Sequence, residues 1–168
     1  MPILRSAFIA LSRNQPLRHF SERSALGRRM SSRFVAGLEV EDVLRAAQSL
    51  QNQGIASTLD SLGENVSTPE QARHSADIYH QLLDAIAQRK LNANISVKLT
   101  QMGLEQSPVL AESIARDLAQ HARTLGNFVR IDMEDSHLTQ ITLDIVRRLH
   151  ARVETRGAIG VVIQAYLY

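Results

Sequence analysis

Four short segments of strand-forming residues, spaced one strand-helix unit apart, constrain the fold of this chain more than any other feature of its sequence. They begin at residues 56, 95, 128 and 160, so their starts lie 39, 33 and 32 residues apart. Strands that alternate with helices at such a regular interval indicate a parallel sheet with right-handed crossovers. We therefore predict an α/β fold: the first half of a (β/α)8 TIM-like barrel, with about four parallel strands preceded by N-terminal helices.

Helix signals fill the intervals between these strands. Thr68, Pro69 and Gln71 combine a capping residue, a proline at the first helical position and a glutamine three residues after the cap. Together they predict the start of a helix. We place the domain boundary after residue 54, with an N-terminal helical arm over 1–54 and the incomplete barrel, strands 1 to 4, over 55–168. Helices are predicted within 4–33, over 39–53, from 68 onward, over 107–126 and over 137–153.

Composition excludes several classes of protein. The chain is 44% hydrophobic and 21% charged, which is ordinary for a globular domain with a core. Lys and Arg number 19 against 17 Asp and Glu, so no nucleic-acid partner is implied. The absence of cysteine excludes disulfides and thiolate metal ligands. No apolar run approaches the roughly 20 residues that span a bilayer, and we expect a cytoplasmic protein, with peripheral contact to the inner membrane as an option.

The first 35 residues are basic, with seven arginines against the single acid Glu22. This composition resembles an organelle-targeting sequence. A basic helical arm that packs across the barrel is the alternative, and we favour it.

Polar side chains end each predicted strand, and in a parallel barrel the carboxyl ends of the strands carry the chemistry. Side chains alternate along a strand, so Lys98 and Asp132 both point to the inside of the barrel from neighbouring strands. Gln164 falls on the fourth predicted strand and could donate and accept hydrogen bonds toward a heterocycle, although a single glutamine on a strand is weak evidence by itself. Lys98, Asp132 and Gln164 are therefore the candidate site residues.

Several interpretations of Lys98 stay open at this point. Its ammonium group suits a substrate carboxylate, and its amine could form an imine in a class I aldolase-like barrel. A purely structural role is the third possibility, in an interior ion-pair layer of Lys98, Arg130, Asp60 and Asp132. The chain could also be a non-enzymatic half-barrel that serves as an assembly module.

A metal site and a nucleotide site are both disfavoured. Glu134, Asp135 and His137 could ligate a metal, but no second histidine lies at ligand spacing, so we favour a solvated loop. The remaining histidines fall in helices or their flanks and are expected at the surface. Glycine-rich phosphate motifs are absent, which argues against a Rossmann site.

Five ordered sequence blocks resemble the monofunctional bacterial proline dehydrogenases. They are RFVAG at 33–37, TLDSLGE at 58–64, ISVKLTQMGL at 95–104, VRIDMEDS at 129–136 and VVIQAYLY at 161–168. The resemblance covers nearly the whole chain, and five blocks in order are more specific than any one of them. One departure is Asp135, where the family usually has glycine.

The resemblance implies a flavin enzyme that oxidises L-proline to 1-pyrroline-5-carboxylate, with FAD as cofactor and a quinone as electron acceptor. It further implies that Lys98 pairs with the proline carboxylate, that Asp132 lies at the flavin and substrate site, and that Gln164 hydrogen-bonds the isoalloxazine of FAD. Flavin supplies the redox chemistry in such enzymes, and the protein supplies orientation and charge.

The resemblance also implies an incomplete site. The family's flavin-contacting arginine on the fifth strand, its later strands, and the last helix with its tyrosine and paired arginines would fall beyond Tyr168. A barrel of four strands leaves two open sheet edges. We therefore expect the chain to be catalytically silent alone and to associate through these edges.

Overall fold

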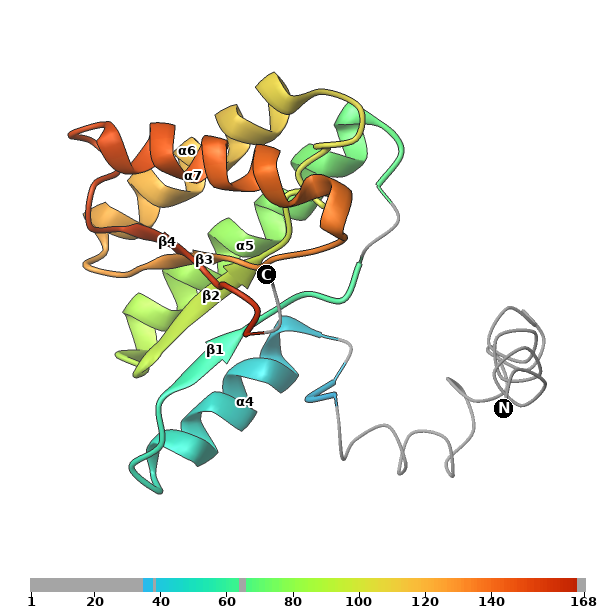
Figure 1. Cartoon of the computed structure of the whole chain (residues 1–168). Helices are drawn as coiled ribbons and strands as arrows, with labels where there is room; N and C mark the ends of the chain where they lie inside the picture. Colours follow the sequence, from blue (N-terminus) through green and yellow to red (C-terminus); the bar gives the residue numbers. More distant parts are fainter. Residues whose placement is uncertain (1–34, 38, 64–65, 166–168) are drawn as a thin grey trace, which may run out of the picture. The chain divides into compact units, whose positions relative to one another are not determined.

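The computed structural model describes residues 35–37, 39–63 and 66–165 (Figure 1). The described residues from 44 onward belong to one compact unit. The helices predicted within 4–33 lie outside the described residues, as does the basic segment up to residue 34. The boundary after residue 54 therefore stays a prediction.

The described strands form one four-stranded parallel sheet. Its strands are β1 (Ser57–Leu59), β2 (Ala93–Val97), β3 (Val129–Ile131) and β4 (Ile159–Val161), and they pair in the order β1-β2-β3-β4. This order, in which each strand lies beside its neighbour in sequence, is that of four successive units of a (β/α)8 barrel. The predicted α/β fold is confirmed.

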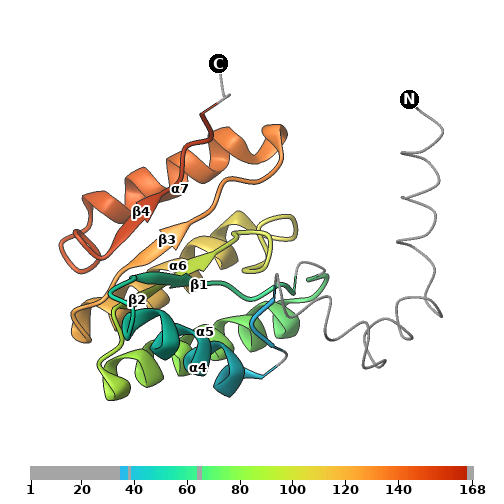
Figure 2. The same cartoon turned by 90° about the horizontal axis from the view of Figure 1, so that it is seen from below.

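Helices alternate with the strands and cover one face of the sheet (Figures 1 and 2). Helix α5 packs on β2, α6 on β3 and α7 on β4, and adjacent helices contact each other. The helices are α4 (Val40–Gln51), α5 (Pro69–Arg89), α6 (Pro108–Thr124) and α7 (Thr139–Ala151), the last preceded by a 3-10 turn at Ser136–Leu138.

The core lies between this face of the sheet and the helices. Ile95, Val97, Val129 and Ile131 are fully buried there, because they point to the helices as the alternation along each strand predicts. The opposite face carries the polar residues of the same strands. From the helices, the core receives Leu44, Ala72, Tyr79, Leu83, Ile86, Ile114, Leu118, Ile145 and Leu149.

Helix α5 begins with the capping box that the sequence predicts. The Thr68 hydroxyl accepts a hydrogen bond from the Gln71 backbone N–H at 3.3 Å, and the Gln71 side chain accepts one from the Thr68 backbone N–H at 3.2 Å. Each side chain thereby satisfies a backbone donor that the first helical turn leaves without an internal partner.

The strands are shorter than predicted. The sequence placed Lys98 on the second strand and Gln164 on the fourth, but β2 ends at Val97 and β4 ends at Val161. Regular pairing of both strands stops where β3 stops, at Ile131, because the chain then leaves the sheet. Lys98 and Gln164 consequently lie beyond the strand ends, on the connecting segments.

Gly160 on β4 permits close approach of an aromatic ring. A Cβ atom built at Gly160 would lie 2.7 Å from Cζ of Phe128. Phe128 immediately precedes β3 and points to the same face as Arg130, whose register partner on β4 is Gly160. The ring therefore lies over the β4 backbone on the inward face of the sheet.

Lys90 at the end of α5 occupies a conformation that favours glycine, with φ 54° and ψ 42°. Lys90→Gly is expected to raise the free energy of unfolding by about 0.5–1 kcal/mol, because a side chain costs energy in the left-handed region. Urea unfolding followed by circular dichroism would measure it. Gln88→Gly, inside the last turn of the same helix, should lower stability by about 1 kcal/mol. Equal effects of the two changes would contradict this account.

Among the described helices, none is both long enough and apolar enough to cross a membrane.

Candidate functional site

Charged side chains gather where the first three strands end. Asp60 directly follows β1, Lys98 follows β2 and Asp132 follows β3. Val97 and Ile131 are register partners, so Lys98 and Asp132 hold the next positions on neighbouring strands. The Asp132 backbone N–H donates to the Val97 carbonyl at 2.9 Å, which extends the pairing to this point.

Lys98 forms an ion pair with Asp60. Its Nζ lies 2.8 Å from Asp60 Oδ2, and the two side chains are 18% and 27% exposed. Partial burial weakens solvent screening and so strengthens the pair compared with a fully exposed one. The ion pair joins the ends of β1 and β2.

The sequence analysis considered an interior ion-pair layer of Lys98, Arg130, Asp60 and Asp132. The ion pair between Lys98 and Asp60 is the part of this layer that forms among the described residues. Within the described residues, no ion pair involves Arg130. The reason is register: Arg130 lies opposite Ser96 on β2 and Gly160 on β4, two residues before Asp132 and therefore deeper along the strand. The prediction of a four-residue ion-pair layer is therefore wrong.

Asp132 is held from the neighbouring strand. The Ser96 hydroxyl donates to Asp132 Oδ1 at 2.6 Å, and Ser96 is only 4% exposed. A carboxylate can accept several hydrogen bonds, so this one orients Asp132 and leaves it able to accept others.

Gln164 lies three residues beyond the end of β4 and is partly exposed. Its carboxamide makes no hydrogen bond to any other described residue. Both its donor and its acceptor are therefore available for a bound group.

A buried tyrosine, Tyr79, forms a hydrogen bond with Asp60. The Tyr79 hydroxyl lies 2.9 Å from Asp60 Oδ1 and 3.0 Å from Gln101 Oε1, and it accepts from the Ser61 backbone N–H at 3.2 Å. Burial, and next the negative charge of Asp60, raise the pKa of Tyr79 well above its usual range, so the hydroxyl stays protonated. The sequence analysis did not single out Tyr79, which lies in the buried apolar stripe of α5. The missed signal is that a tyrosine in such a stripe needs a hydrogen-bond partner for its hydroxyl.

Glu134 does not lie free in a solvated loop, as the sequence suggested. Its carboxylate accepts hydrogen bonds from the Thr100 backbone N–H, at 3.1 Å, and from the Thr100 hydroxyl. It thereby ties the segment after β3 to the segment after β2. In the described part of the chain, no three His, Asp or Glu side chains are arranged to hold a metal ion.

Two histidines predicted at the surface instead meet between α5 and α6. His80 Nδ1 lies 2.7 Å from His121 Nδ1, and His121 Nε2 lies 2.8 Å from Asp84 Oδ1. Only one of the two facing nitrogens can carry a proton in such a contact. Burial, and next the nearby His121, lower the pKa of His80, while Asp117, Asp77 and Asp84 oppose that shift.

The lowered pKa of His80 predicts a loss of stability in acid. The unfolded chain takes up a proton at His80 near the ordinary pKa of about 6.5, whereas the folded chain resists it until a lower pH. The stabilisation is therefore complete above pH 6.5 and is lost as the pH falls through the folded pKa. Urea unfolding at pH 8 and pH 5 should show a smaller pH effect in His80→Gln than in the wild type. His74→Gln, an exposed histidine on the same helix, should keep the wild-type pH effect.

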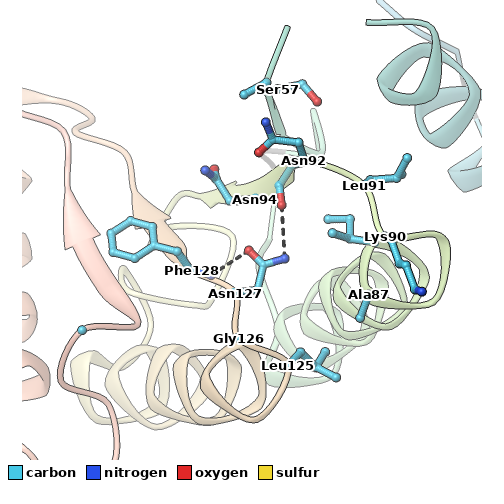
Figure 3. A pocket seen from close by; sticks show the side chains of 14 residues that line it. Ser57, Ala87, Lys90, Leu91, Asn92, Asn94, Leu125, Gly126, Asn127 and Phe128 are labelled. Atoms are coloured by element: carbon cyan, nitrogen blue, oxygen red, sulfur yellow. Dashed lines mark hydrogen bonds between the residues drawn. The ribbon is translucent and has the colours of Figure 1, made fainter. Parts of the chain in front are cut away.

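A polar depression of about 570 Å³ lies at the opposite edge of the sheet, where the strands begin (Figure 3). There the Asn127 side chain donates to the Ala93 carbonyl at 3.2 Å and accepts from the Phe128 backbone N–H at 2.7 Å. These bonds fix local backbone, and none of the candidate site residues lines the depression. Lys90 does line it, so the two lysines lie at opposite edges of the sheet.

The fold and the site define a parallel α/β chain whose carboxyl strand edge carries a lysine and two carboxylates. The chain belongs to the proline dehydrogenase family: the family model described as "Proline dehydrogenase" matches residues 43–168. The resemblance inferred from the five sequence blocks is confirmed.

Curated relatives match almost the whole chain. Proline dehydrogenase 1 of Bacillus subtilis (strain 168) is 38% identical over 168 residues, which are 99% of this chain and 54% of the relative. Proline dehydrogenase of Deinococcus radiodurans is 35% identical over 144 residues, 83% of this chain and 46% of that protein. The chain thus spans about half the length of these relatives.

Solved structures share the fold. The crystal structure of proline utilization A (PutA) from Bdellovibrio bacteriovorus, inactivated by N-propargylglycine, superimposes with a TM-score of 0.74 at 21% identity, over 84% of this chain and 17% of that one. A PutA mutant structure from Bradyrhizobium japonicum gives a TM-score of 0.66 at 24% identity, over 83% of this chain and 16% of that one.

Proposed function

We propose that this chain contributes Lys98, Asp132 and Gln164 to a site that oxidises L-proline to 1-pyrroline-5-carboxylate, with FAD as cofactor and a quinone as electron acceptor. The observation that carries the proposal is the position of Lys98 and Asp132, which directly follow register-paired residues of neighbouring strands in a chain of this family. We place the reaction in the cytoplasm, with peripheral contact to the inner membrane where the quinone lies.

Lys98 would bind the proline carboxylate. Its ammonium group already pairs with Asp60 at 2.8 Å, so a substrate carboxylate would share Lys98 with Asp60 or replace it. The partly buried position favours this interaction, because two opposite charges attract more strongly where water is partly excluded.

Asp132 would act on the amine end of the substrate. As the ring carbon next to nitrogen loses a hydride, positive charge develops on the nitrogen, and a nearby carboxylate stabilises that charge. The hydrogen bond from Ser96, at 2.6 Å, keeps the Asp132 carboxylate in one orientation. Such prior orientation is what makes electrostatic stabilisation effective.

Gln164 fits a flavin ring. Its carboxamide offers one donor group and one acceptor, neither of which is used within the described residues, and it lies past the end of β4. FAD, when bound, would accept the hydride from proline. Gln164 would hold the edge of the isoalloxazine by hydrogen bonds.

The 168-residue chain would not turn over proline by itself. Among the described strands, β1 and β4 each pair with a single neighbour, so both have an open edge. Lys98 alone provides a point charge, whereas recognition of a carboxylate is stronger with a bidentate partner. The same open edges favour self-association, which sedimentation would detect.

A chimera tests the function. Residues 1–168 would replace the matched segment of Bacillus subtilis proline dehydrogenase 1, to which they are 38% identical. The chimera should purify with flavin absorbance and oxidise proline, and the isolated chain should not. A folded, flavin-loaded chimera without activity would overturn the assignment of these residues. Proline oxidation by the isolated chain would overturn its proposed inactivity.

The aldolase-like interpretation is weaker than the flavin one. Imine formation needs a neutral amine, and the Asp60 carboxylate at 2.8 Å stabilises the charged form of Lys98. Borohydride trapping of Lys98 with a carbonyl substrate would reverse this preference.

A further inference from the structure

Tyr79 is the one fully buried aromatic side chain in the described part of the chain that reaches the carboxyl edge of the sheet. It belongs to α5 in the helical layer, and its hydroxyl is in hydrogen-bond contact with Asp60 Oδ1. The ion pair between Asp60 and Lys98 lies on the other side of that carboxylate, with Tyr79 at Oδ1 and Lys98 at Oδ2. Tyr79, Asp60 and Lys98 therefore form a continuous chain from the core to the candidate site.

Proton counting fixes the direction of these hydrogen bonds. A tyrosine hydroxyl carries one proton, while two acceptors, Asp60 Oδ1 at 2.9 Å and Gln101 Oε1 at 3.0 Å, lie within reach of it. A charged acceptor forms the stronger hydrogen bond, so the proton points to Asp60. The Ser61 N–H, at 3.2 Å, fills a lone pair of the hydroxyl oxygen.

Gln101 lies beside the hydroxyl and is itself fixed by hydrogen bonds to backbone groups. Gln101 is 1% exposed. Its Oε1 accepts from the Lys98 backbone N–H at 3.3 Å, and its Nε2 donates to the Ser61 carbonyl. The Gln101 side chain thus links the backbone after β1 to the backbone after β2. Rotation of Tyr79 away from Asp60 would cost the Asp60 carboxylate and the Ser61 backbone N–H their hydrogen bonds to the hydroxyl.

We propose that Tyr79 is a positioning residue, which through Asp60 holds the Lys98 ammonium in the place where a substrate carboxylate binds. This inference rests on the proposed function for its consequence in catalysis, but its structural part can be tested without any substrate. Tyr79 itself does not touch the substrate. It limits the motion of the Asp60 carboxylate, which in turn limits the motion of the Lys98 ammonium group.

The chain is well suited to a direct test because it contains two lysines, Lys90 and Lys98. With carbon-13-labelled lysine in the full chain, each Cε methylene gives a separate NMR signal whose order parameter reports side-chain motion. In the wild type the Cε order parameter of Lys98 should exceed that of exposed Lys90. In Tyr79→Phe it should fall toward the Lys90 value, while Lys90 stays unchanged.

Control variants separate positioning from a general loss of stability. Ile86→Val lies in the core on the same helix and should lower stability without touching the network. Thr142→Val removes a buried hydroxyl that has no partner within the described residues. Both should leave the Lys98 order at its wild-type value. In Asp60→Asn the order should fall, and adding Tyr79→Phe should cause no further fall.

Rescue and activity complete the experiment. 4-Aminophenylalanine at position 79 keeps the ring and a donor, so it should restore the order of Lys98. In the chimera, Tyr79→Phe should raise KM for proline about fivefold and leave kcat within twofold, as expected for loss of about 1 kcal/mol of orientation. An unchanged order of Lys98 in folded Tyr79→Phe would overturn the inference. A chimera inactive with tyrosine at 79 would instead count against the proposed function.

Discussion

Alanine in place of Lys98 is expected to lower kcat/KM for proline about 10- to 100-fold in the chimera. Loss of a hydrogen bond to a charged group costs about 1.5–3 kcal/mol, and each 1.4 kcal/mol is a factor of ten. The effect should fall mainly on KM, because Lys98 is assigned to the carboxylate, which does not change during the reaction. Steady-state kinetics with proline as the varied substrate would measure it.

Lys90→Ala is the matched control for this prediction. Lys90 is exposed and lines the depression at the opposite edge of the sheet, so its removal changes the net charge equally and should leave kcat/KM within twofold. A Lys98→Ala chimera that keeps near-wild-type kcat/KM would show that Lys98 belongs to a structural ion pair only. Loss of kcat with KM unchanged would indicate a role in chemistry rather than in carboxylate binding.

Alanine in place of Gly160 is expected to lower the free energy of unfolding by about 1–3 kcal/mol, the usual cost of overpacking. The added Cβ would lie 2.7 Å from Cζ of Phe128, closer than van der Waals contact allows. Either the ring or the β4 backbone must move, and β4 has only three residues to hold it in the sheet. Urea unfolding followed by circular dichroism would measure the loss.

A double-mutant cycle assigns this loss to the ring. Phe128→Leu removes the ring atom in conflict, so Gly160→Ala should cost less in the Phe128→Leu background than in the wild type. Gly63→Ala is the control, since a Cβ there would meet nothing within 4 Å. Equal costs of Gly160→Ala in both backgrounds would place the strain elsewhere, in the backbone of β4.

The fold could be predicted because its signals are local or periodic. The alternation along ISVKLT and VRIDM determines which side chains face the helices, and the Thr68 to Gln71 spacing determines where α5 begins. Strand ends could not be predicted, because regular pairing of β2 and β4 stops at Ile131 of the strand between them. That limit depends on a partner strand about 30 residues away in sequence.

The site could be predicted in part for the same reason. Lys98 and Asp132 follow from the parity of neighbouring strands, and Asp60 was named as an ion-pair partner. The contacts of Tyr79, Glu134 and His80 were missed, since each joins residues separated by 19, 34 and 41 positions. Only the tertiary structure determines which polar groups such side chains meet.

The short strands have a consequence for how this scaffold can change. With β1, β3 and β4 each three residues long, few backbone hydrogen bonds hold neighbouring strands together. Three side-chain links near the carboxyl edge, Lys98 with Asp60, Ser96 with Asp132 and Thr100 with Glu134, supplement them. Substitutions that adapt this edge to a different substrate would therefore also loosen the sheet, and a variant with new specificity would need compensating stabilisation in the helical layer.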